Sequence, residues 1–489
     1  MALRIALIAV PLMDLLDGRM VPISMDAVRS CPPYGIYHLA TVLKQAGHEV
    51  VVIDLIAAGS ADLRPYLGLL SASQIVGVGS SSLAWPAARA CIAALRAIRP
   101  DVPIVLGGIH PTMFDRYALA TTAADFVIRG EAEVAFPRLC DALCGRGALR
   151  DVPSLTWRPT AGRIARNPAG PLMSAAALAQ DPGPDFQGIP AGIYAGVAVE
   201  SSRGCPFDCA FCSTSYRGTW RALPPAAVVD RIARVVPALD RTTSRFAQVI
   251  DDEFTVKPQR VVEICQGLAA RRLDLRLIYD ARANDLQDEG FIAAVRSHTH
   301  QFLVGAECGY DDGLQRVGKG TTVEKLEHAA RLLAKHHMAE RADFSFMLGL
   351  PWEGKAEVMS TVRFAHRLYS TYGVRVLLQW YCQIPGSRLW EEQRRREILH
   401  EAQYDEFGFF RDLYLFRCGV ALAPSEVLAV HEAVTAMQSL SRRDHAGVQL
   451  FQTSTPEPIL HYYPPNTGAG DSTALANLRA LARAGSAGG

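Results

Sequence analysis

The sequence predicts two α/β domains in series, followed by a small and mostly helical C-terminal domain. Short apolar runs alternate with helical segments through residues 1–145, and the same alternation restarts at 193 and continues to 390. A Pro/Gly/Asp-rich connector at 146–192 separates the two series, and residues 391–489 form the C-terminal part. A chain of 489 residues is long enough for two or three domains.

The first series predicts a doubly wound parallel sheet. Its apolar runs are continuous, as expected of strands that are covered on both faces. Ligands of such sheets bind beyond the carboxyl ends of the strands, and the absence of G-x-G-x-x-G after the first strand argues against a dinucleotide. The expected strands are 3–10, 49–55, 75–80, 103–108 and 125–130, and the expected helices are 34–46, about 84–97 and 132–144.

The second series predicts six β/α units. A hairpin turning at Ala161-Gly162 and a linker at 180–186 precede it. In such an array, reactive groups gather at the carboxyl ends of the strands. The expected strands are 196–201, 246–250, 275–281, 301–306, 342–348 and 374–381, and the expected helices are 224–237, 258–271, 288–296, 322–337 and 355–371.

The C-terminal part predicts a helical cap over the mouth of the second domain. It contains a charged helix at 391–399 and a second helix near 424–440. Its aromatic segments FGFFRDLYLF and HYYPP could line a substrate site, although the core of the cap itself is the favoured role. The last residues are expected to fray beyond one short helix.

Composition indicates a cytoplasmic protein. The net charge of +1 provides no strong field for nucleic acid or an anionic membrane. Eleven cysteines, scattered except for one cluster, favour a reduced compartment over a disulfide framework. The apolar run at the N-terminus is short and is followed by Asp14 and Asp17, so a buried strand is favoured over a signal segment. No run of 18 apolar residues predicts a membrane span.

The cysteine cluster is Cys205, Cys209 and Cys212, with CxxxCxxC spacing. Thiolates are the soft ligands that an iron–sulfur cluster needs, and three of them would leave the fourth iron of a [4Fe–4S] cluster open to a small molecule. The alternative is half of a zinc site, but no CxxC or CxxH partner with zinc spacing follows.

This spacing resembles the signature of radical SAM enzymes, in which S-adenosylmethionine (SAM) chelates the open iron. Phe211, directly before the third cysteine, fits the same signature. The resemblance implies a partial (β/α)6 TIM barrel and assigns SAM contacts to its strand ends. These are Asp251, Asp252 and Glu253 for the ammonium group, Arg282 for the carboxylate or the acidic run, and Glu307 for the ribose.

The first domain resembles the Rossmann-like cobalamin-binding domain that precedes many radical SAM barrels. Segments 31–55 and 129–139 carry the likeness, together with a Ser-x-Leu and a Gly-Gly that would line the slot for the nucleotide tail. No histidine occurs before His38, so the resemblance implies base-off cobalamin without a protein imidazole. The implied cobalamin contacts are Pro33, Tyr34, Ser81, Leu83, Gly107, Gly108, His110 and Glu131.

His110 admits a simpler interpretation, because a lone histidine is more often a packing or hydrogen-bonding residue. For the whole first domain, the alternative is a Rossmann-like domain that binds a nucleotide or nothing.

The combined resemblance covers about residues 1–390 and implies a cobalamin-dependent radical SAM methyltransferase. In that chemistry a deoxyadenosyl radical takes hydrogen from an unactivated carbon, which then receives a methyl group from cobalt. The expected partners are a small natural-product substrate and an electron donor such as flavodoxin or ferredoxin, with no nucleic acid or membrane. The alternatives are a radical cyclase, ring-rearranging or oxidative enzyme without methyl transfer, and a cobalamin-binding regulator with a vestigial barrel.

Overall fold

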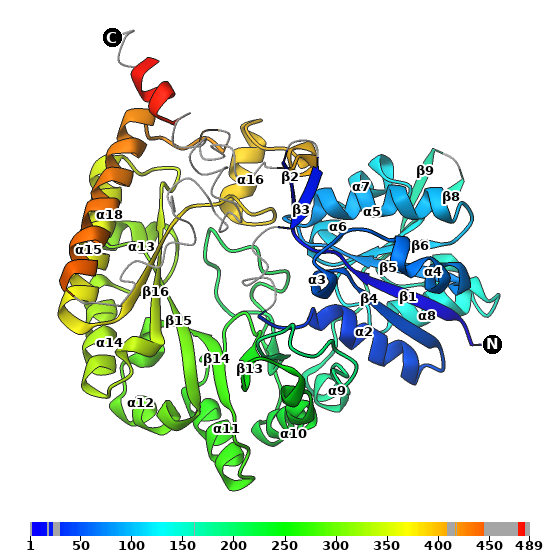
Figure 1. Cartoon of the computed structure of the whole chain (residues 1–489), viewed down its shortest axis with the longest axis horizontal. Helices are drawn as coiled ribbons and strands as arrows, with labels where there is room; N and C mark the ends of the chain where they lie inside the picture. Colours follow the sequence, from blue (N-terminus) through cyan, green and yellow to red (C-terminus); the bar gives the residue numbers. More distant parts are fainter. Residues whose placement is uncertain are drawn as a thin grey trace. The chain divides into compact units, whose positions relative to one another are not determined.

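The computed structural model describes residues 2–16, 19–22, 30–160, 162–407, 416, 418–444 and 478–484 (Figure 1). The chain divides into two units, which are described separately below. The first unit comprises Met1–Glu200, Asp230–Arg245 and His400–Phe407, and the second comprises Ser201–Val229, Phe246–Leu399 and Gly408–Gly489.

The first unit is built on a seven-stranded sheet with the order β4-β1-β5-β6-β7-β8-β9. Its first five strands in this order are parallel, and all five were predicted from the sequence. The predicted hairpin is also present, and it extends the sheet with two antiparallel strands. The strands are β1 (Arg4–Ala9), β4 (Glu49–Asp54), β5 (Ile75–Gly79), β6 (Ile104–Gly107), β7 (Phe126–Ile128), β8 (Leu155–Thr160) and β9 (Arg163–Arg166).

Helices cover both faces of this sheet, as expected of a doubly wound fold (Figure 1). Helices α2 (Tyr34–Gln45) and α8 (Ala135–Leu143) share a buried apolar core with β1, and α5 (Trp85–Ile98) lies on the other face. Glycine at position 77 allows close packing, because a Cβ there would lie 2.6 Å from Leu7 and 3.3 Å from Phe136.

A short hairpin in the first unit was not predicted. Strands β2 (Met13–Leu16) and β3 (Arg19–Pro22) pair antiparallel directly after β1. The sequence between them is Asp17-Gly18, a common two-residue hairpin connection, so a signal was present. The hydrophobic pattern hid it, because Asp14 interrupts the apolar run.

The second sheet has the strand order β10-β13-β14-β15-β16-β17, which follows the sequence. Neighbouring strands from β13 to β17 are parallel, and helices α11, α12, α14 and α15 lie along one side of them (Figure 1). All six strands and all five helices predicted for this series are present. The strands are β10 (Val197–Val199), β13 (Phe246–Val249), β14 (Arg276–Ala281), β15 (Thr299–Glu307), β16 (Ala342–Leu348) and β17 (Arg375–Trp380). The helices are α10 (Pro225–Val235), α11 (Pro258–Ala270), α12 (Glu289–Val295), α14 (Val323–Lys335) and α15 (Lys355–Tyr372).

The C-terminal part contains both predicted helices. Helix α16 (Arg388–Arg395) begins earlier than predicted, because the Ser387 side chain accepts a hydrogen bond from the Trp390 amide and caps it. Helix α18 (Pro424–Asp444) packs against α15. Most of FGFFRDLYLF, all of HYYPP and most of the last residues lie outside the described residues. Among the described helices, none is long and apolar enough to cross a membrane.

One C-terminal segment, His400–Phe407, belongs to the first unit. The Asp405 carboxylate accepts hydrogen bonds from Trp85 Nε1 at 2.8 Å and from the Tyr117 hydroxyl at 2.6 Å, and it pairs with Arg89 at 2.9 Å. The buried ring of Tyr404 lies beside Phe114. The segment therefore completes the packing of the first unit.

Candidate functional site

The three cysteines lie on a loop between two short antiparallel strands, β11 (Ser202–Arg203) and β12 (Arg221–Ala222). Gly204 starts this loop with a φ of +80°, and a Cβ there would overlap the Thr219 carbonyl oxygen. Only glycine fits this turn, which places Cys205 at the beginning of the loop.

Two buried charges hold the ends of the cysteine loop. The Asp251 carboxylate accepts hydrogen bonds from the Ser201 amide at 2.7 Å, the Ser201 hydroxyl at 2.5 Å and the Ser202 hydroxyl at 2.6 Å. Arg260 donates to the carbonyl oxygens of Ser201 at 2.6 Å and Leu223 at 3.0 Å. Burial raises the pKa of Asp251 to about 6, and the hydrogen bonds from the serines oppose this shift. The loop is thus tied to β13 and α11 at both ends.

The thiols have the chemistry that an iron–sulfur cluster requires. Cys209 is buried, and Cys205 and Cys212 are half-buried. Burial raises the pKa of Cys205 to about 11 and also raises the pKa of Cys212, so both are neutral thiols until a metal displaces their protons. In the described part of the chain, no three His, Cys, Asp or Glu side chains are already grouped as metal ligands. Binding a cluster would therefore draw the three sulfurs together within the loop.

Two cations lie close to Cys209. The Arg282 guanidinium stacks 3.7 Å from the centre of the Phe207 ring, with Nη1 3.9 Å from the Cys209 sulfur. Arg282 also donates to the Lys319 carbonyl oxygen. Positive charge in this position would offset the negative charge of a cluster held by thiolates.

Lys319 and Glu307 form a buried ion pair of 2.7 Å at the end of β15. Burial lowers the pKa of Lys319, but the charges of Glu307 and Cys209 more than offset this, so the pKa lies above its usual value. The pairing with β16 shifts between Gly305 and Glu307, and Glu307 has a φ of +62°. A Cβ at Gly305 would overlap both charged groups. Lys319 was absent from the predicted site, although its position after the fourth strand end was visible in the sequence.

The acidic run after β13 separates into three environments. The buried Asp251 carboxylate accepts its hydrogen bonds from Ser201 and Ser202. Glu253 is also buried and accepts hydrogen bonds from the amide and hydroxyl of Thr255 at 3.0 and 2.8 Å. Burial raises the pKa of Glu253 to about 7. Asp252 is exposed. Of these carboxylates, Asp252 is therefore the one accessible to a ligand.

The residues predicted to bind cobalamin gather at the carboxyl ends of the parallel strands in the first unit. Pro33 and Tyr34 start α2, Ser81 and Leu83 follow β5, and Glu131 follows β7. Some of these side chains also support the local fold: Ser81 accepts a hydrogen bond from the Ala84 amide at 3.3 Å, and Glu131 accepts one from the Met173 amide at 2.7 Å.

The two glycines after β6 differ in their surroundings. A Cβ at Gly107 would meet no heavy atom within 4 Å. Gly108 has a φ of +93°, and a Cβ there would lie 2.5 Å from the Ser80 carbonyl oxygen. Gly108 thus allows the close approach of two backbone segments, while Gly107 faces open space.

His110 lies in an aromatic cluster. Its ring is 0% exposed, stacks 4.4 Å from Trp85 and contacts Phe114 edge-on. Nδ1 lies 3.1 Å from the Ser82 hydroxyl, and burial lowers the pKa of His110 to about 3. This environment matches the packing role that was the simpler interpretation of a lone histidine.

A small pocket, with room for about one water molecule, lies in the second unit beyond β16 and β17. Its polar lining includes Tyr381 and Gln383, whose amide nitrogen donates to the Cys418 carbonyl at 2.8 Å. The other lining residues are Gly349, Pro351, Gly419 and Val420. Ligands of barrel folds bind at this end of the strands, but this pocket is too small to hold a metabolite.

Comparison with known families agrees with the two halves of the chain. Residues 23–140 match the B12 binding domain, and residues 199–365 match the Radical SAM superfamily. The chain therefore belongs to the cobalamin-dependent radical SAM enzymes, as predicted. The predicted cofactors, cobalamin, SAM and a [4Fe–4S] cluster, are those of this family.

Relatives of the chain include named methyltransferases and cyclases. An uncharacterised methyltransferase of Pyrococcus horikoshii is 28% identical over 371 residues, which cover 74% of this chain and 78% of the relative. The anaerobic magnesium-protoporphyrin IX monomethyl ester cyclase of Synechocystis is 25% identical over 368 residues, covering 70% and 72%.

Two solved structures share the fold. The radical SAM methyltransferase TsrM from Kitasatospora setae has a TM-score of 0.66 at 16% identity, over 98% of this chain and 96% of TsrM. The cobalamin-dependent radical SAM enzyme OxsB has a TM-score of 0.59 at 18% identity, over 75% of this chain and 52% of OxsB. At these identities the likeness concerns the fold alone.

Replacement of Cys205, Cys209 and Cys212 by alanine should abolish binding of a [4Fe–4S] cluster. After anaerobic reconstitution, iron and sulfide analysis should give about four irons in the wild-type protein and almost none in the triple variant. Cys144→Ala is the control, because Cys144 is half-buried in the first unit. Full iron content in the triple variant would refute the assignment.

Gly107→Leu should abolish cobalamin retention in a folded protein, because its side chain would enter open space at the strand end. Gly108→Leu should instead destabilise the first unit, owing to the contact with Ser80 and the positive φ. Absorbance of bound hydroxocobalamin and thermal unfolding distinguish the two results. Gly188→Leu, also in open space, is the control. Normal cobalamin content in Gly107→Leu would place the slot elsewhere.

Asp252→Ala should weaken SAM binding roughly tenfold to hundredfold, the usual cost of losing a hydrogen bond to a charged group. Unfolding and cluster content should not change, because Asp252 is exposed. Asp251→Asn should instead loosen the cysteine loop. Equilibrium binding of SAM measures the effect, with the exposed Asp274→Ala as the control. Unchanged affinity in Asp252→Ala would leave the acidic run without a role in SAM binding.

Proposed function

We propose that this protein methylates an unactivated carbon of a small natural product. When bound, the cluster and SAM would supply a 5′-deoxyadenosyl radical, and cobalamin would supply the methyl group. The observation that carries the proposal is the cysteine loop, which lies beside Arg282 and Lys319 at the carboxyl end of a parallel sheet. Named methyltransferases among the relatives support methyl transfer.

Each side chain near the cysteine loop has a defined task in this proposal. Cys205, Cys209 and Cys212 hold the cluster, with Phe211 beside the third cysteine. Arg282 binds the SAM carboxylate, since its planar guanidinium is already fixed on Phe207. Asp252 accepts from the SAM ammonium group.

Glu307 has a positioning task as well as a binding task. One of its carboxylate oxygens pairs with Lys319, which leaves the other to accept from the ribose hydroxyls of SAM. The ion pair fixes the side chain before the ligand arrives, so little conformational entropy is lost on binding.

The first unit would bind cobalamin at its strand ends without an imidazole ligand below the cobalt. No histidine occurs before His38, and both ring nitrogens of His38 face carboxylates, Asp181 at 2.7 Å and Glu133 at 3.6 Å. The other proposed contacts are Pro33, Tyr34, Ser81, Leu83, Gly107, Gly108 and Glu131, with His110 supporting the slot from the aromatic cluster.

The surroundings of the protein are also part of the proposal. All eleven cysteines, each in the described residues, are free thiols, which supports a reduced cytoplasmic location. Flavodoxin or ferredoxin would donate the electron. The proposal also places the domain limits at residues 145, 192 and 390.

A second candidate is a cyclase, ring-rearranging or oxidative reaction without methyl transfer. The cyclases among the relatives favour it, as does a 4′-phospho-dehydrooxetanocin synthase that is 25% identical over 159 residues. The side chains described above are compatible with both reactions, so the two candidates are distinguished by their products.

Product mass decides between these functions. The reconstituted protein would receive methyl-deuterated SAM, a reductant and the small-molecule fraction of its native cell. We expect 5′-deoxyadenosine and a metabolite that carries a deuterated methyl group. A product that loses hydrogen without gaining a methyl group would support the second candidate. Absence of 5′-deoxyadenosine would contradict both and favour a cobalamin-binding regulator.

Electron paramagnetic resonance of the cob(II)alamin form tests the proposed coordination. We expect a base-off spectrum without superhyperfine splitting from an axial nitrogen, because the first strand and its loop contain no imidazole. Observed nitrogen splitting would contradict this assignment. His38→Gln is a useful comparison, since its spectrum should match that of the wild-type protein.

A further inference from the structure

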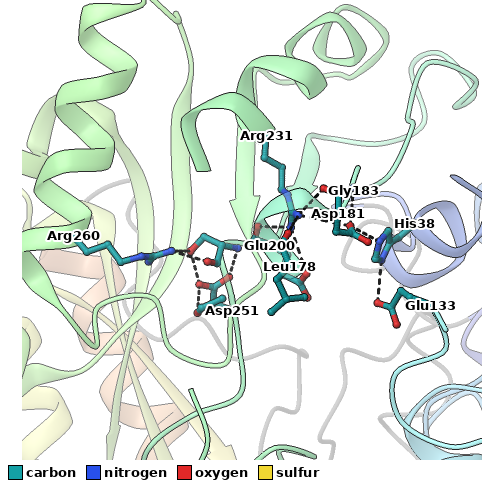
Figure 2. Close-up of polar contacts among 11 residues, drawn as sticks. His38, Glu133, Leu178, Asp181, Gly183, Glu200, Arg231, Asp251 and Arg260 are labelled. Carbon is teal, nitrogen blue, oxygen red and sulfur yellow. Dashed lines mark hydrogen bonds and ion pairs between the residues drawn. The ribbon is translucent and has the colours of Figure 1, made fainter. Parts of the chain in front are cut away.

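A line of buried polar contacts leads from the first unit to the start of the cysteine loop (Figure 2). It begins at Glu133, in the loop that follows β7, and passes through His38, Asp181 and Arg231 to Glu200. Glu200 is bonded directly to Ser201, the first residue of the second unit. The mechanism proposed above uses none of these five residues as a ligand.

His38 connects the loop after β7 to the linker between the two α/β series. Its ring is 4% exposed, with Nε2 2.7 Å from Asp181 and Nδ1 3.6 Å from Glu133. Glu133 lies two residues beyond Glu131, one of the proposed cobalamin contacts. A movement of the loop after β7 would therefore be transmitted to the linker through the buried ring of His38.

The Arg231 guanidinium contacts both the linker and the residue that follows β10. It is 1% exposed and donates to the carbonyl oxygens of Leu178 at 2.8 Å, Asp181 at 3.1 Å and Glu200 at 3.2 Å. The carboxylates of Asp181 and Glu200 lie 3.7 and 3.5 Å from it. Such a buried cation holds its partners in one arrangement, because moving a partner away would leave a buried hydrogen-bond donor unsatisfied.

The contacts converge on a single peptide group. Arg231 holds the Glu200 carbonyl oxygen from the side of the first unit, and Asp251 holds the Ser201 N–H from the side of the second. These two atoms belong to the same planar unit, so they cannot move independently. Cys205 follows only four residues later.

We propose that this relay, Glu133–His38–Asp181–Arg231–Glu200, couples occupancy of the cobalamin slot to the order of the cysteine loop. The inference rests on the proposed binding of cobalamin in the first unit. Cobalamin that fixes the loop after β7 would restrain Glu133 and, through the buried contacts, the peptide group before the cluster. The five residues are positioning residues, because none touches a cofactor.

Hydrogen exchange tests the coupling without a substrate. The protein with its reconstituted cluster would be compared with and without hydroxocobalamin, and exchange would be followed in peptides covering residues 199–205. We expect cobalamin to slow this exchange roughly tenfold in the wild-type protein and less than about twofold in His38→Gln, within the usual range of coupling between sites. Lys44→Gln, exposed on the same helix, should behave as wild type.

Additional variants separate coupling from general destabilisation. If His38→Gln lowers the unfolding temperature strongly, Glu133→Ala, at the least buried end of the relay with a side chain that is 11% exposed, should show the same loss of coupling in a folded protein. His38→Gln combined with Arg231→Lys should lose no more coupling than either change alone, because both interrupt one path. Arg234→Lys, exposed on the same helix as Arg231, is the second control.

The outcomes are distinct. Equal slowing by cobalamin in the wild type, His38→Gln and Glu133→Ala would overturn the relay while leaving cobalamin binding intact. Failure of the wild-type protein to retain hydroxocobalamin would instead contradict the proposed function. If the wild-type protein and the variants retain cobalamin but exchange at residues 199–205 is not slowed in any of them, the cysteine loop does not respond to occupancy of the slot. This result would also overturn the proposal.

Discussion

The candidate site depends on how Asp251 and Arg260 bind the two ends of the cysteine loop. A loop that must wrap a metal cluster cannot be stabilised by its own apolar core, so its entry and exit need polar anchors. The Asp251 carboxylate accepts hydrogen bonds from Ser201 and Ser202, and the Arg260 guanidinium donates hydrogen bonds to the carbonyl oxygens of Ser201 and Leu223. Both anchors belong to the following β/α unit, so the position of the cysteine loop depends on that unit. This dependence explains why a strongly buried carboxylate lies just beyond β13.

Much of the fold was predictable because continuous apolar strands and amphipathic helices leave clear patterns in the sequence. Periodicity could not resolve the acidic run, where the burial of three neighbouring carboxylates depends on the partners that other elements supply. Asp251 accepts hydrogen bonds from the serines of the loop, Glu253 accepts hydrogen bonds from Thr255, and Asp252 is exposed to solvent. Lys319 was missed for a similar reason, since its role follows from a bulge at Gly305 that no local pattern encodes.

The charges around the cysteine loop are balanced. Arg282 and Lys319 bring positive charge toward Cys209, while Glu307 and the acidic run bring negative charge. A cluster held by three thiolates and a ligand with both an ammonium and a carboxylate group require this mixture. The same balance limits the cost of burial when the site is empty, because Lys319 and Glu307 neutralise one another. The charged side chains are consequently arranged before the cofactors arrive, whereas the three sulfurs come together only when a cluster binds.

The return of His400–Phe407 to the first unit affects how the protein is made. During synthesis, the N-terminal sheet can assemble long before this segment leaves the ribosome. Until then Trp85, Tyr117 and Arg89 lack the carboxylate of Asp405, and the aromatic cluster of His110 lacks Tyr404. The N-terminal half would therefore mature only after the barrel strands have been translated.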